Sequence, residues 1–520
     1  MVAERRWPWL LRAGVAGIVS AAAFLGIAEL TALLLSPGAS PLVAVGSFVV
    51  DIVPQQVKEL AIAWFGAADK IVLLGSLGLA AAVGAAIAGI AEWWRRPVGS
   101  VLFAVVAVAV GAALATRAGA GALAVAPAVT GGIVALIVLH ILIRALRTWK
   151  DARAAEASAE DESTGTGRRT FLRVAIITTA AAVVVGTGSR LVSATTSSIQ
   201  AIREALRLPA PRSRVTIPAG AELDVEGISP LFTPNADFYR VDTALTVPQI
   251  DPAEWRLVID GMVENEIELT FDDLLAMGLD EYAVTLTCVS NEVGGNLLGN
   301  ALWQGIPVRD LLAQAVPSAD ADMVLSRSID GFTASTPLES LTDDGLDAIL
   351  AVAMNGDPLP LEHGFPVRMV VPGLYGYVSA TKWLTRLTVT RFDQDEAYWT
   401  PRGYSERAPI KMSSRIDTPR VDAPVDAGTV AIGGVAWAQP VGVGRVEVQI
   451  DSGDWQEATL SAPINGQTWV QWMLPWEATA GTHNLTVRAF DLNGDQQIEE
   501  RAPIAPDGSS GWQRTLVTVR

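Results

Sequence analysis

Four long apolar segments near the start of the chain constrain its fold more than any other feature. They cover residues 10–35, 70–93, 98–116 and 123–146, and a helix needs about 20 such residues to cross a bilayer. Half of the 520 residues are apolar and only 18% are charged, which is unusual for a soluble enzyme of this size. We therefore expect an α-helical membrane domain.

A fifth apolar segment, at 171–195, would complete a domain of about five transmembrane helices over residues 1–195. Positive charges cluster on one side of such a domain, at residues 5–12, 95–96 and 144–169. Positively charged loops remain in the cytoplasm, so five spans would place the rest of the chain on the extracytoplasmic side of the cell membrane. The stretch 42–66 contains charged residues and a proline, and is expected to be interfacial or re-entrant.

The fifth segment begins with GRRTFLR, residues 167–173, which has the adjacent arginines of a twin-arginine export signal. Arginines that merely keep a loop in the cytoplasm would look the same, so both interpretations remain open. A haem within the membrane is not expected. His140 is the sole histidine of the apolar segments, and a b-type haem in a bilayer needs a pair of axial ligands.

The rest of the chain is acidic and divides into two soluble domains. Residues 201–520 carry 22 basic and 44 acidic side chains, which argues against binding to nucleic acid. A linker over 196–235 precedes residues 236–407, where short helix and strand patterns mix as in an α+β domain. From 408 to 520 the helix patterns disappear, and short alternating strands with turn residues between them predict an immunoglobulin-like β-sandwich.

Apolar periodicity predicts individual elements within the α+β part. Residues 270–277 are expected to form a helix capped by Thr270 or Asp272, and 308–316 a second helix. Strands are expected at 254–263, 283–288, 321–329, 365–373 and 384–392.

The single cysteine, Cys288, is the strongest chemical signal in the soluble part. With one cysteine and three histidines, the chain has no internal disulfide and no Cys-x-x-Cys metal site. Cys288 ends a strand pattern and opens a Gly/Asn-rich loop, where the backbone can approach a bulky ligand closely. The residues leave three alternatives open: a buried small side chain, a nucleophile assisted by His363, or a thiolate ligand of a metal whose other ligands come from a cofactor.

Four motifs around this cysteine resemble the sulfite oxidase family of molybdenum enzymes. They are LTCVSNEVGGN, ALWQGIPVRDLL, AVAMNGDPLPLEHGFPVRMVVPG and YGYVSATKWLTRLTV, within residues 286–389. The resemblance extends over about 230–520 and includes the β-sandwich, which looks like the family's dimerisation domain, so it implies a possible homodimer. It also implies an oxidoreductase with a single molybdopterin cofactor, a small-molecule substrate and an electron-transfer partner that the sequence does not identify.

The resemblance also implies roles for individual residues. Cys288 matches the cysteine whose thiolate ligates molybdenum, and it forms the expected catalytic set with Arg240, Asp242 and Arg402. Guanidinium and ammonium groups suit the phosphate of the pterin. The expected cofactor-binding residues are Phe238, Tyr239, Arg240, His363, Arg368, Ser379, Thr381 and Lys382.

Two positions depart from the family pattern and leave the substrate open. Phe332 in FTASTP stands where the family has a tyrosine, and Asp242 stands where it has a histidine. A phenolic donor is lost and a carboxylate is added, whereas Arg402 keeps part of an anion site. Oxygen-atom transfer involving sulfite or an S- or N-oxide is therefore expected. The alternative is a non-catalytic membrane-anchored scaffold that retains the molybdopterin and immunoglobulin-like domains.

Overall fold

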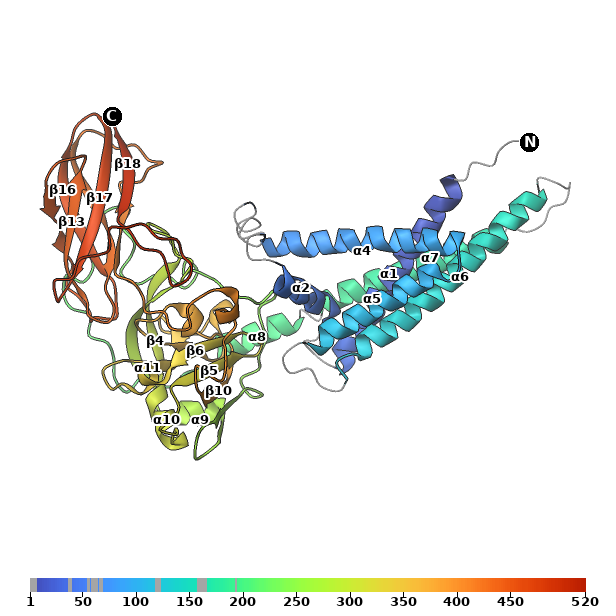
Figure 1. The fold of residues 1–520 in the computed structure, drawn as a ribbon, viewed down its shortest axis with the longest axis horizontal. Helices are drawn as coiled ribbons and strands as arrows, with labels where there is room; N and C mark the ends of the chain where they lie inside the picture. Colours follow the sequence, from blue (N-terminus) through green and yellow to red (C-terminus); the bar gives the residue numbers. More distant parts are fainter. Residues whose placement is uncertain are drawn as a thin grey trace. The chain divides into compact units, whose positions relative to one another are not determined.

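The computed structural model describes residues 7–35, 40–53, 57, 64, 69–116, 123–156, 166–191 and 194–520 (Figure 1). The chain divides into two compact units. The first comprises Met1–Ser198 with Ala244–Thr246, and the second comprises Ile199–Thr243 with Val247–Arg520. Each unit has its own architecture, helical in the first and rich in β-sheet in the second.

Long helices build the first unit. In chain order they are α1 (Trp7–Leu35), α2 (Pro41–Ile52), α4 (Asp69–Trp94), α5 (Val98–Ala115), α6 (Ala126–Glu156) and α7 (Thr166–Leu191), followed by α8 (Ala194–Ala205). Helix α1 packs against α4, α6 and α7. Glycines let α1 and α4 approach closely: a Cβ atom on Gly17 would lie 1.9 Å from the Ala85 carbonyl oxygen. Small residues at helix contacts are typical of membrane bundles.

Four helices in the described part of the chain are long and apolar enough to cross a membrane. They are Trp7–Leu35, Val72–Trp94, Val98–Ala115 and Ala126–Arg153, which correspond to the four expected segments. The chain therefore carries a multi-pass helical membrane anchor, as expected. The fifth expected segment is helical within α7, and GRRTFLR lies at the start of that helix. Five spans and an export signal remain predictions.

The expected interfacial or re-entrant stretch is described only in part. Helix α2 covers its first half and is capped by the Ser40 side chain, which accepts a hydrogen bond from the Val43 N–H group. Residues 54–56, 58–63 and 65–68 lie outside the described residues. The interfacial or re-entrant placement of 42–66 therefore remains a prediction.

Two five-stranded sheets form the α+β part of the second unit. The first has the order β2-β1-β10-β5-β6, with β1 and β10 parallel and the other pairs antiparallel. The second has the order β3-β4-β7-β8, and β9 pairs with β7. The strands are β1 (Arg256–Gly261), β2 (Ile267–Thr270), β3 (Asp280–Thr287), β4 (Leu298–Pro307), β5 (Met323–Ser328), β6 (Thr333–Pro337), β7 (Ile349–Met354), β8 (Asp357–Pro358), β9 (Arg368–Val370) and β10 (Leu384–Thr390).

Short helices connect these strands where the sequence predicts them. They are α9 (Phe271–Ala276), α10 (Val308–Ala315) and α11 (Leu338–Thr342). Thr270 caps α9 in a reciprocal arrangement with Asp273, which is the capping box that begins many helices. The strand expected at 365–373 is shorter, only Arg368–Val370, because Pro366 and Pro372 have no N–H group to donate to a neighbouring strand.

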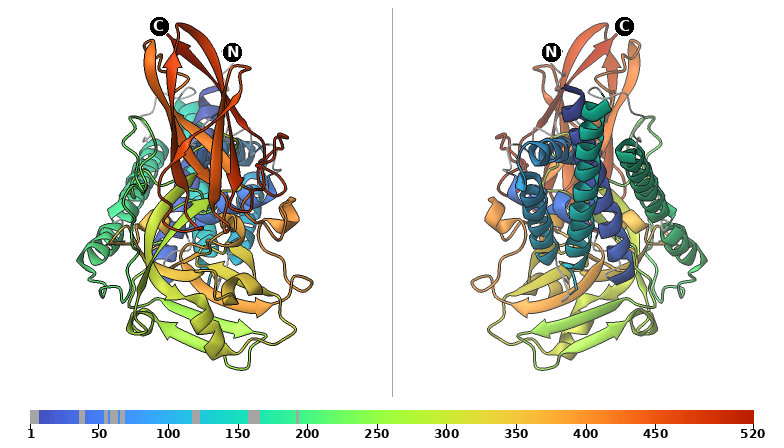
Figure 2. Two further views of the ribbon diagram at one scale, coloured as in Figure 1. Left: turned by 90° about the vertical axis from the view of Figure 1, so that its left-hand side faces the viewer. Right: turned by 90° about the vertical axis from the view of Figure 1, so that its right-hand side faces the viewer.

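The remaining strands form a β-sandwich of two four-stranded antiparallel sheets, coloured orange to red in Figure 2. The first sheet is β11 (Ser413–Thr418), β12 (Gly428–Trp437), β16 (Val470–Ala478) and β15 (Thr459–Leu460); the second is β14 (Trp455–Glu457), β13 (Val443–Ile450), β17 (Gly481–Asp491) and β18 (Gln513–Val519). Their inner faces share one core that includes Ile432, Val446, Trp472 and Val487. The expected fold class, a helical membrane domain with an α+β domain and an immunoglobulin-like sandwich, is confirmed.

The sandwich also fixes the loop that follows Cys288. Ser509 donates its hydroxyl hydrogen to the Asn291 carbonyl oxygen at 2.7 Å, and Arg415 donates to the Gly295 carbonyl oxygen at 2.9 Å. Arg415 is held in place by an ion pair of 2.6 Å with Asp417. Residues more than 100 positions away in sequence therefore set the path of this loop.

Candidate active site

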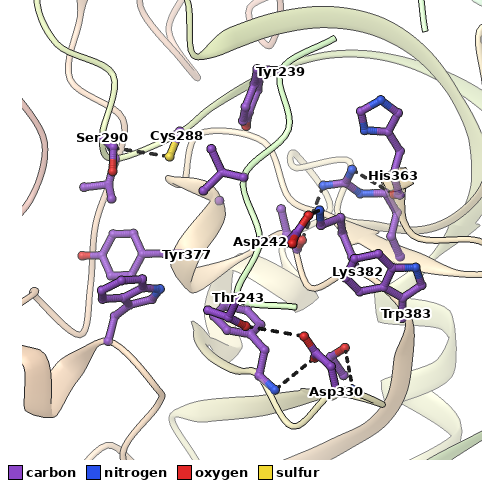
Figure 3. A pocket seen from close by; sticks show the side chains of 18 of the residues that line it. Tyr239, Asp242, Thr243, Cys288, Ser290, Asp330, His363, Tyr377, Lys382 and Trp383 are labelled. Carbon is purple, nitrogen blue, oxygen red and sulfur yellow. Dashed lines mark hydrogen bonds and ion pairs between the residues drawn. The ribbon is translucent and has the colours of Figure 1, made fainter. Parts of the chain in front are cut away.

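A pocket in the second unit brings together segments from across the α+β part. It holds about 910 Å³ of empty space, its open mouth included, which is in the range of cofactor and substrate sites. Figure 3 shows its side chains. The lining is drawn from residues 238–243, 288–290, 328–332, 363–368, 376–383 and 399–404.

Cys288 lies at the carboxyl end of β3, where the chain leaves the sheet in a tight turn. The Cys288 N–H group donates to the Leu297 carbonyl oxygen at 2.9 Å, and the Asn291 N–H group donates to the Cys288 carbonyl oxygen at 3.0 Å. The Ser290 N–H group points at the Cys288 sulfur at 3.4 Å (Figure 3). Burial raises the pKa of the thiol, while Ser290 and Lys382 act to lower it. Metal coordination would deprotonate such a thiol.

Arg368 is a cation buried against this pocket. Its side chain donates hydrogen bonds to the carbonyl oxygens of His363 at 3.2 Å, Met369 at 3.3 Å and Ala380 at 3.4 Å. It is only 5% exposed, and burial lowers its pKa to about 10. A buried guanidinium bound to carbonyl oxygens keeps its full positive charge, which favours an anion in the adjoining space.

His363 is neutral at physiological pH. Burial and the nearby Arg368 lower its pKa to about 4. Its Nε2 atom lies 3.1 Å from the Asn235 carbonyl oxygen, and a carbonyl only accepts hydrogen bonds, so the ring proton is on Nε2. Nδ1 is therefore an acceptor, suited to a donor group on a bound cofactor.

Asp242 is ion-paired within the pocket. Its Oδ2 atom lies 2.8 Å from the Lys382 ammonium and 2.8 Å from Nε of Arg240. Figure 3 shows Asp242 and Lys382 side by side. Burial lowers the pKa of Lys382 to about 8, against the opposing effect of Asp242. The carboxylate that the sequence adds to the pocket thus partly neutralises two cations.

Seven of the expected site residues line the pocket: Phe238, Tyr239, Asp242, Cys288, His363, Arg368 and Lys382. Other expected residues lie behind it. The Ser379 hydroxyl donates to the Tyr375 carbonyl oxygen at 2.9 Å, and the Thr381 hydroxyl lies 2.7 Å from the Ser326 hydroxyl. Both side chains are fully buried, so they position the 379–382 loop.

The two remaining expected arginines lie beside the pocket and are not part of its lining. Arg240 reaches Asp242 from the more exposed side. Arg402 donates to the Tyr398 carbonyl oxygen at 2.5 Å, and its guanidinium lies 3.7 Å from the centre of the Tyr398 ring. Either arginine would need a change of side-chain conformation to contact a molecule in the pocket.

Sequence reasoning missed the aromatic end of the pocket. Tyr377, Trp399 and Tyr404 line it together with Phe332. The Tyr404 ring lies 5.6 Å from that of Tyr377 and 5.2 Å from that of Trp399. The density of aromatic residues in YWTPRGY, 398–404, was the available signal. These rings give an apolar wall beside the polar end formed by Cys288, Arg368 and Lys382.

The side chains present fit an anionic cofactor that brings its own metal ligands. The single cysteine supplies one soft sulfur donor, and a metal bound there would need further donors from a cofactor. Arg368 and Lys382 provide positive charge at the same pocket. This donor set matches the thiolate ligand and the phosphate-binding cations expected for molybdopterin.

Comparisons with known proteins agree with this chemistry. The family model for the oxidoreductase molybdopterin binding domain matches residues 244–399. Mitochondrial sulfite oxidase of Mus musculus is 32% identical over 367 residues, covering 60% of this chain and 66% of that protein. The uncharacterized oxidoreductase YuiH of Bacillus subtilis is 34% identical over 157 residues, covering 30% of this chain and 75% of that protein. The chain thus spans just under two thirds of the mouse protein.

One solved structure gives a further comparison. The sulfane dehydrogenase SoxCD from Paracoccus pantotrophus is 23% identical, with a TM-score of 0.49 over 59% of this chain and 88% of that one.

Proposed function

Because this chain belongs to the sulfite oxidase family of molybdopterin-binding oxidoreductases, we propose that it transfers oxygen atoms at a molybdenum ligated by Cys288. The observation that carries the proposal is the buried thiol of Cys288, which faces the same pocket as the cations Arg368 and Lys382. A soft ligand and an anion-binding site lie together there.

The residues of the pocket divide between the metal and the pterin. Cys288 would hold the metal, and the Ser290 N–H group directed at its sulfur would stabilise the thiolate. Arg368 and Lys382 would bind the phosphate, while Nδ1 of His363 would accept a hydrogen bond from the pterin. When bound, the cofactor supplies a metal that exchanges two electrons as an oxygen atom moves to or from sulfur or nitrogen.

The pocket favours a neutral oxide over sulfite as the substrate. Asp242 offsets the charges of Lys382 and Arg240, and Phe332 offers no hydrogen bond to an oxyanion. The wall of Phe332, Tyr377, Trp399 and Tyr404 can contact the organic part of a sulfoxide or N-oxide. Reduction of such an oxide consumes two electrons and two protons from an external donor and releases water.

We expect purified full-length protein to contain about one molybdenum per chain and to prefer neutral oxides. Its kcat/KM with a sulfoxide and a reduced viologen donor should exceed its kcat/KM with sulfite and an artificial acceptor. Affinity for sulfite should also fall as the pH rises through about 8, because Lys382 then loses its proton, whereas affinity for a sulfoxide should not change. Molybdenum-free protein that retains activity would contradict the proposal.

A Phe332→Tyr variant isolates the missing phenol. A hydrogen bond to a charged group contributes about 1.5–3 kcal/mol, so kcat/KM for sulfite should rise by about tenfold or more, with little change for a sulfoxide. Phe392→Tyr is the control, since Phe392 lies outside the pocket lining and packs against Arg407. An equal gain in both variants would show that the phenol does not act on the substrate.

We also propose that the second unit lies on the extracytoplasmic side of the cell membrane. The proposal rests on α7 as a fifth span and on the positive clusters around the first, third and fifth segments. Reporters fused after residues 160 and 210 should then be found on opposite sides of the membrane, as shown by paired cytoplasmic and periplasmic reporter activities. Cytoplasmic activity at both positions would exclude this topology.

A further inference from the structure

One end of the helical unit gathers aromatic rings from four helices. The Trp9 ring of α1 lies 6.2 Å from that of Trp93 in α4 and 5.6 Å from that of Trp149 in α6. The Phe171 ring of α7 lies 6.3 Å from that of Trp149. These four rings form what is called here the tryptophan cluster, at the junction of α1, α4, α6 and α7.

Positive side chains surround the tryptophan cluster. The Arg12 guanidinium lies between two of its rings, 4.8 Å from the centre of Trp9 and 4.3 Å from that of Trp149. Three further cations are placed over the same rings. They are Arg168, 5.9 Å from Trp149, and Arg147 and Lys150, 5.9 Å and 5.7 Å from Trp93.

The Arg12 side chain lacks an acceptor for part of its charge. Its Nη1 atom is buried and has no hydrogen-bond partner among the residues that the structure describes. Its charged neighbours, Arg153 and Arg168, are also positive. Glu92 is buried at the same end, but its carboxylate accepts the Ser100 N–H hydrogen bond at 2.9 Å and pairs with Arg96 at 3.7 Å. A buried guanidinium donor among like charges requires an anion.

Exposed apolar side chains adjoin this cationic site on the same helices. On α1, Leu11 is 62% and Val15 46% exposed; on α7, Ile176 is 65% and Ile177 67% exposed. Helices α1 and α7 pack against each other. A molecule with both a phosphate and acyl chains would cover the cations and the apolar side chains together, whereas inorganic phosphate would cover only the cations.

We propose that Arg12, Arg168 and the tryptophan cluster bind the phosphate of an anionic phospholipid, whose acyl chains lie along α1 and α7. Aromatic rings hold the guanidinium groups by cation–π contact, so these groups are oriented before the lipid binds. Basic sites between membrane helices are suited to anionic headgroups. Binding there would connect four helices that converge at this end of the unit.

The test uses the full-length protein in nanodiscs of phosphatidylcholine containing a minor fraction of phosphatidylglycerol. Native mass spectrometry of the released protein should detect retained phosphatidylglycerol in preference to phosphatidylcholine. Each charge near an anionic lipid contributes about 1 kcal/mol, so Arg12→Gln and Arg168→Gln should each reduce the retained phosphatidylglycerol about fivefold.

Arg169→Gln is the matched control and should retain the wild-type amount of lipid. Arg168 and Arg169 are adjacent on α7 and equally part of the GRRTFLR motif, but Arg168 has the contact with Trp149. Equal losses in these two variants would overturn the proposal in favour of general surface charge. Equal retention of both lipids, or stabilisation against heat by inorganic phosphate as large as that by phosphatidylglycerol, would also overturn it.

Two measurements separate loss of lipid from loss of fold. Arg12→Lys keeps the positive charge and should keep most of the lipid, which a variant that merely misfolds would not. Molybdenum content of the same samples reports on the second unit. Lipid loss in Arg12→Lys equal to that in Arg12→Gln would contradict an electrostatic phosphate site.

Discussion

Replacing Cys288 by serine is expected to reduce turnover by about 1,000-fold or more, as the loss of an essential catalytic group does, while the pterin content remains near that of the wild type. The hard hydroxyl of serine is a poor substitute for a thiolate on a soft metal. The pterin is retained because Arg368 and Lys382, which would bind its phosphate, are unchanged. Steady-state kinetics and the fluorescence of oxidised pterin released from the protein measure the two effects.

Ser290→Ala is the matched control for this substitution. It removes the Ser290 hydroxyl but keeps the N–H group that points at the Cys288 sulfur, so we expect turnover within a few-fold of the wild type. A Cys288→Ser variant with wild-type turnover would show that the thiolate does not ligate the metal. Loss of pterin together with loss of turnover would show that Cys288 holds the whole cofactor.

Replacing Arg368 by methionine is expected to reduce the cofactor content itself. A charge-assisted hydrogen bond contributes about 1.5–3 kcal/mol, so the affinity for a phosphate-bearing cofactor should fall about tenfold to a hundredfold. Methionine fills a similar apolar volume and removes a buried charge whose pKa burial lowers to about 10, so the cofactor-free protein should unfold at no lower temperature. Molybdenum and pterin per chain, with thermal unfolding, are the measurements.

Arg203→Met separates loss of the phosphate contact from loss of an ordinary structural arginine. Arg203 also donates to main-chain carbonyl oxygens, those of Leu359 at 2.7 Å and Pro358 at 2.8 Å, but it does not line the pocket. We expect wild-type cofactor content in this variant. Full occupancy in Arg368→Met, or equal depletion in both variants, would contradict a direct role for Arg368 in binding phosphate.

Much of the architecture follows from local sequence. The membrane helices are specified by apolar runs long enough to span a bilayer, and no tertiary contact is needed to recognise them. Helix α9 begins at Thr270 because its side chain and that of Asp273 satisfy free N–H groups within one turn. The change from mixed elements to short alternating strands near residue 408 likewise marks the sandwich, since period-2 alternation produces one buried face per strand.

Only part of the site can be assigned at this level. Cys288 and Arg368 stand out because one is the single cysteine and the other is a charge among valines in a buried strand. Their motifs carry the resemblance to the family. The tertiary structure brings both to one pocket although 80 positions separate them in the sequence.

The electrostatics of the pocket depend on contacts that sequence patterns do not encode. The sequence shows that Asp242 adds a carboxylate, but its pairing with Lys382, 140 positions away, is visible only in the fold. Ser379 and Thr381 match the family motif, yet their hydroxyls turn toward the core. Side-chain direction in a loop follows from the packing of whatever lies on either side.

The loop after Cys288 shows the same division most clearly. Its glycines and asparagines predict that the chain turns there, because these residues favour turns. The path of the turn depends on Ser509 and Arg415 of the sandwich, which bind its carbonyl oxygens. The sequence alone therefore determined the membrane anchor, the fold class and the ligand-bearing residue. The tertiary structure decided the charge balance and shape of the pocket, because both arise from contacts between residues far apart in the chain.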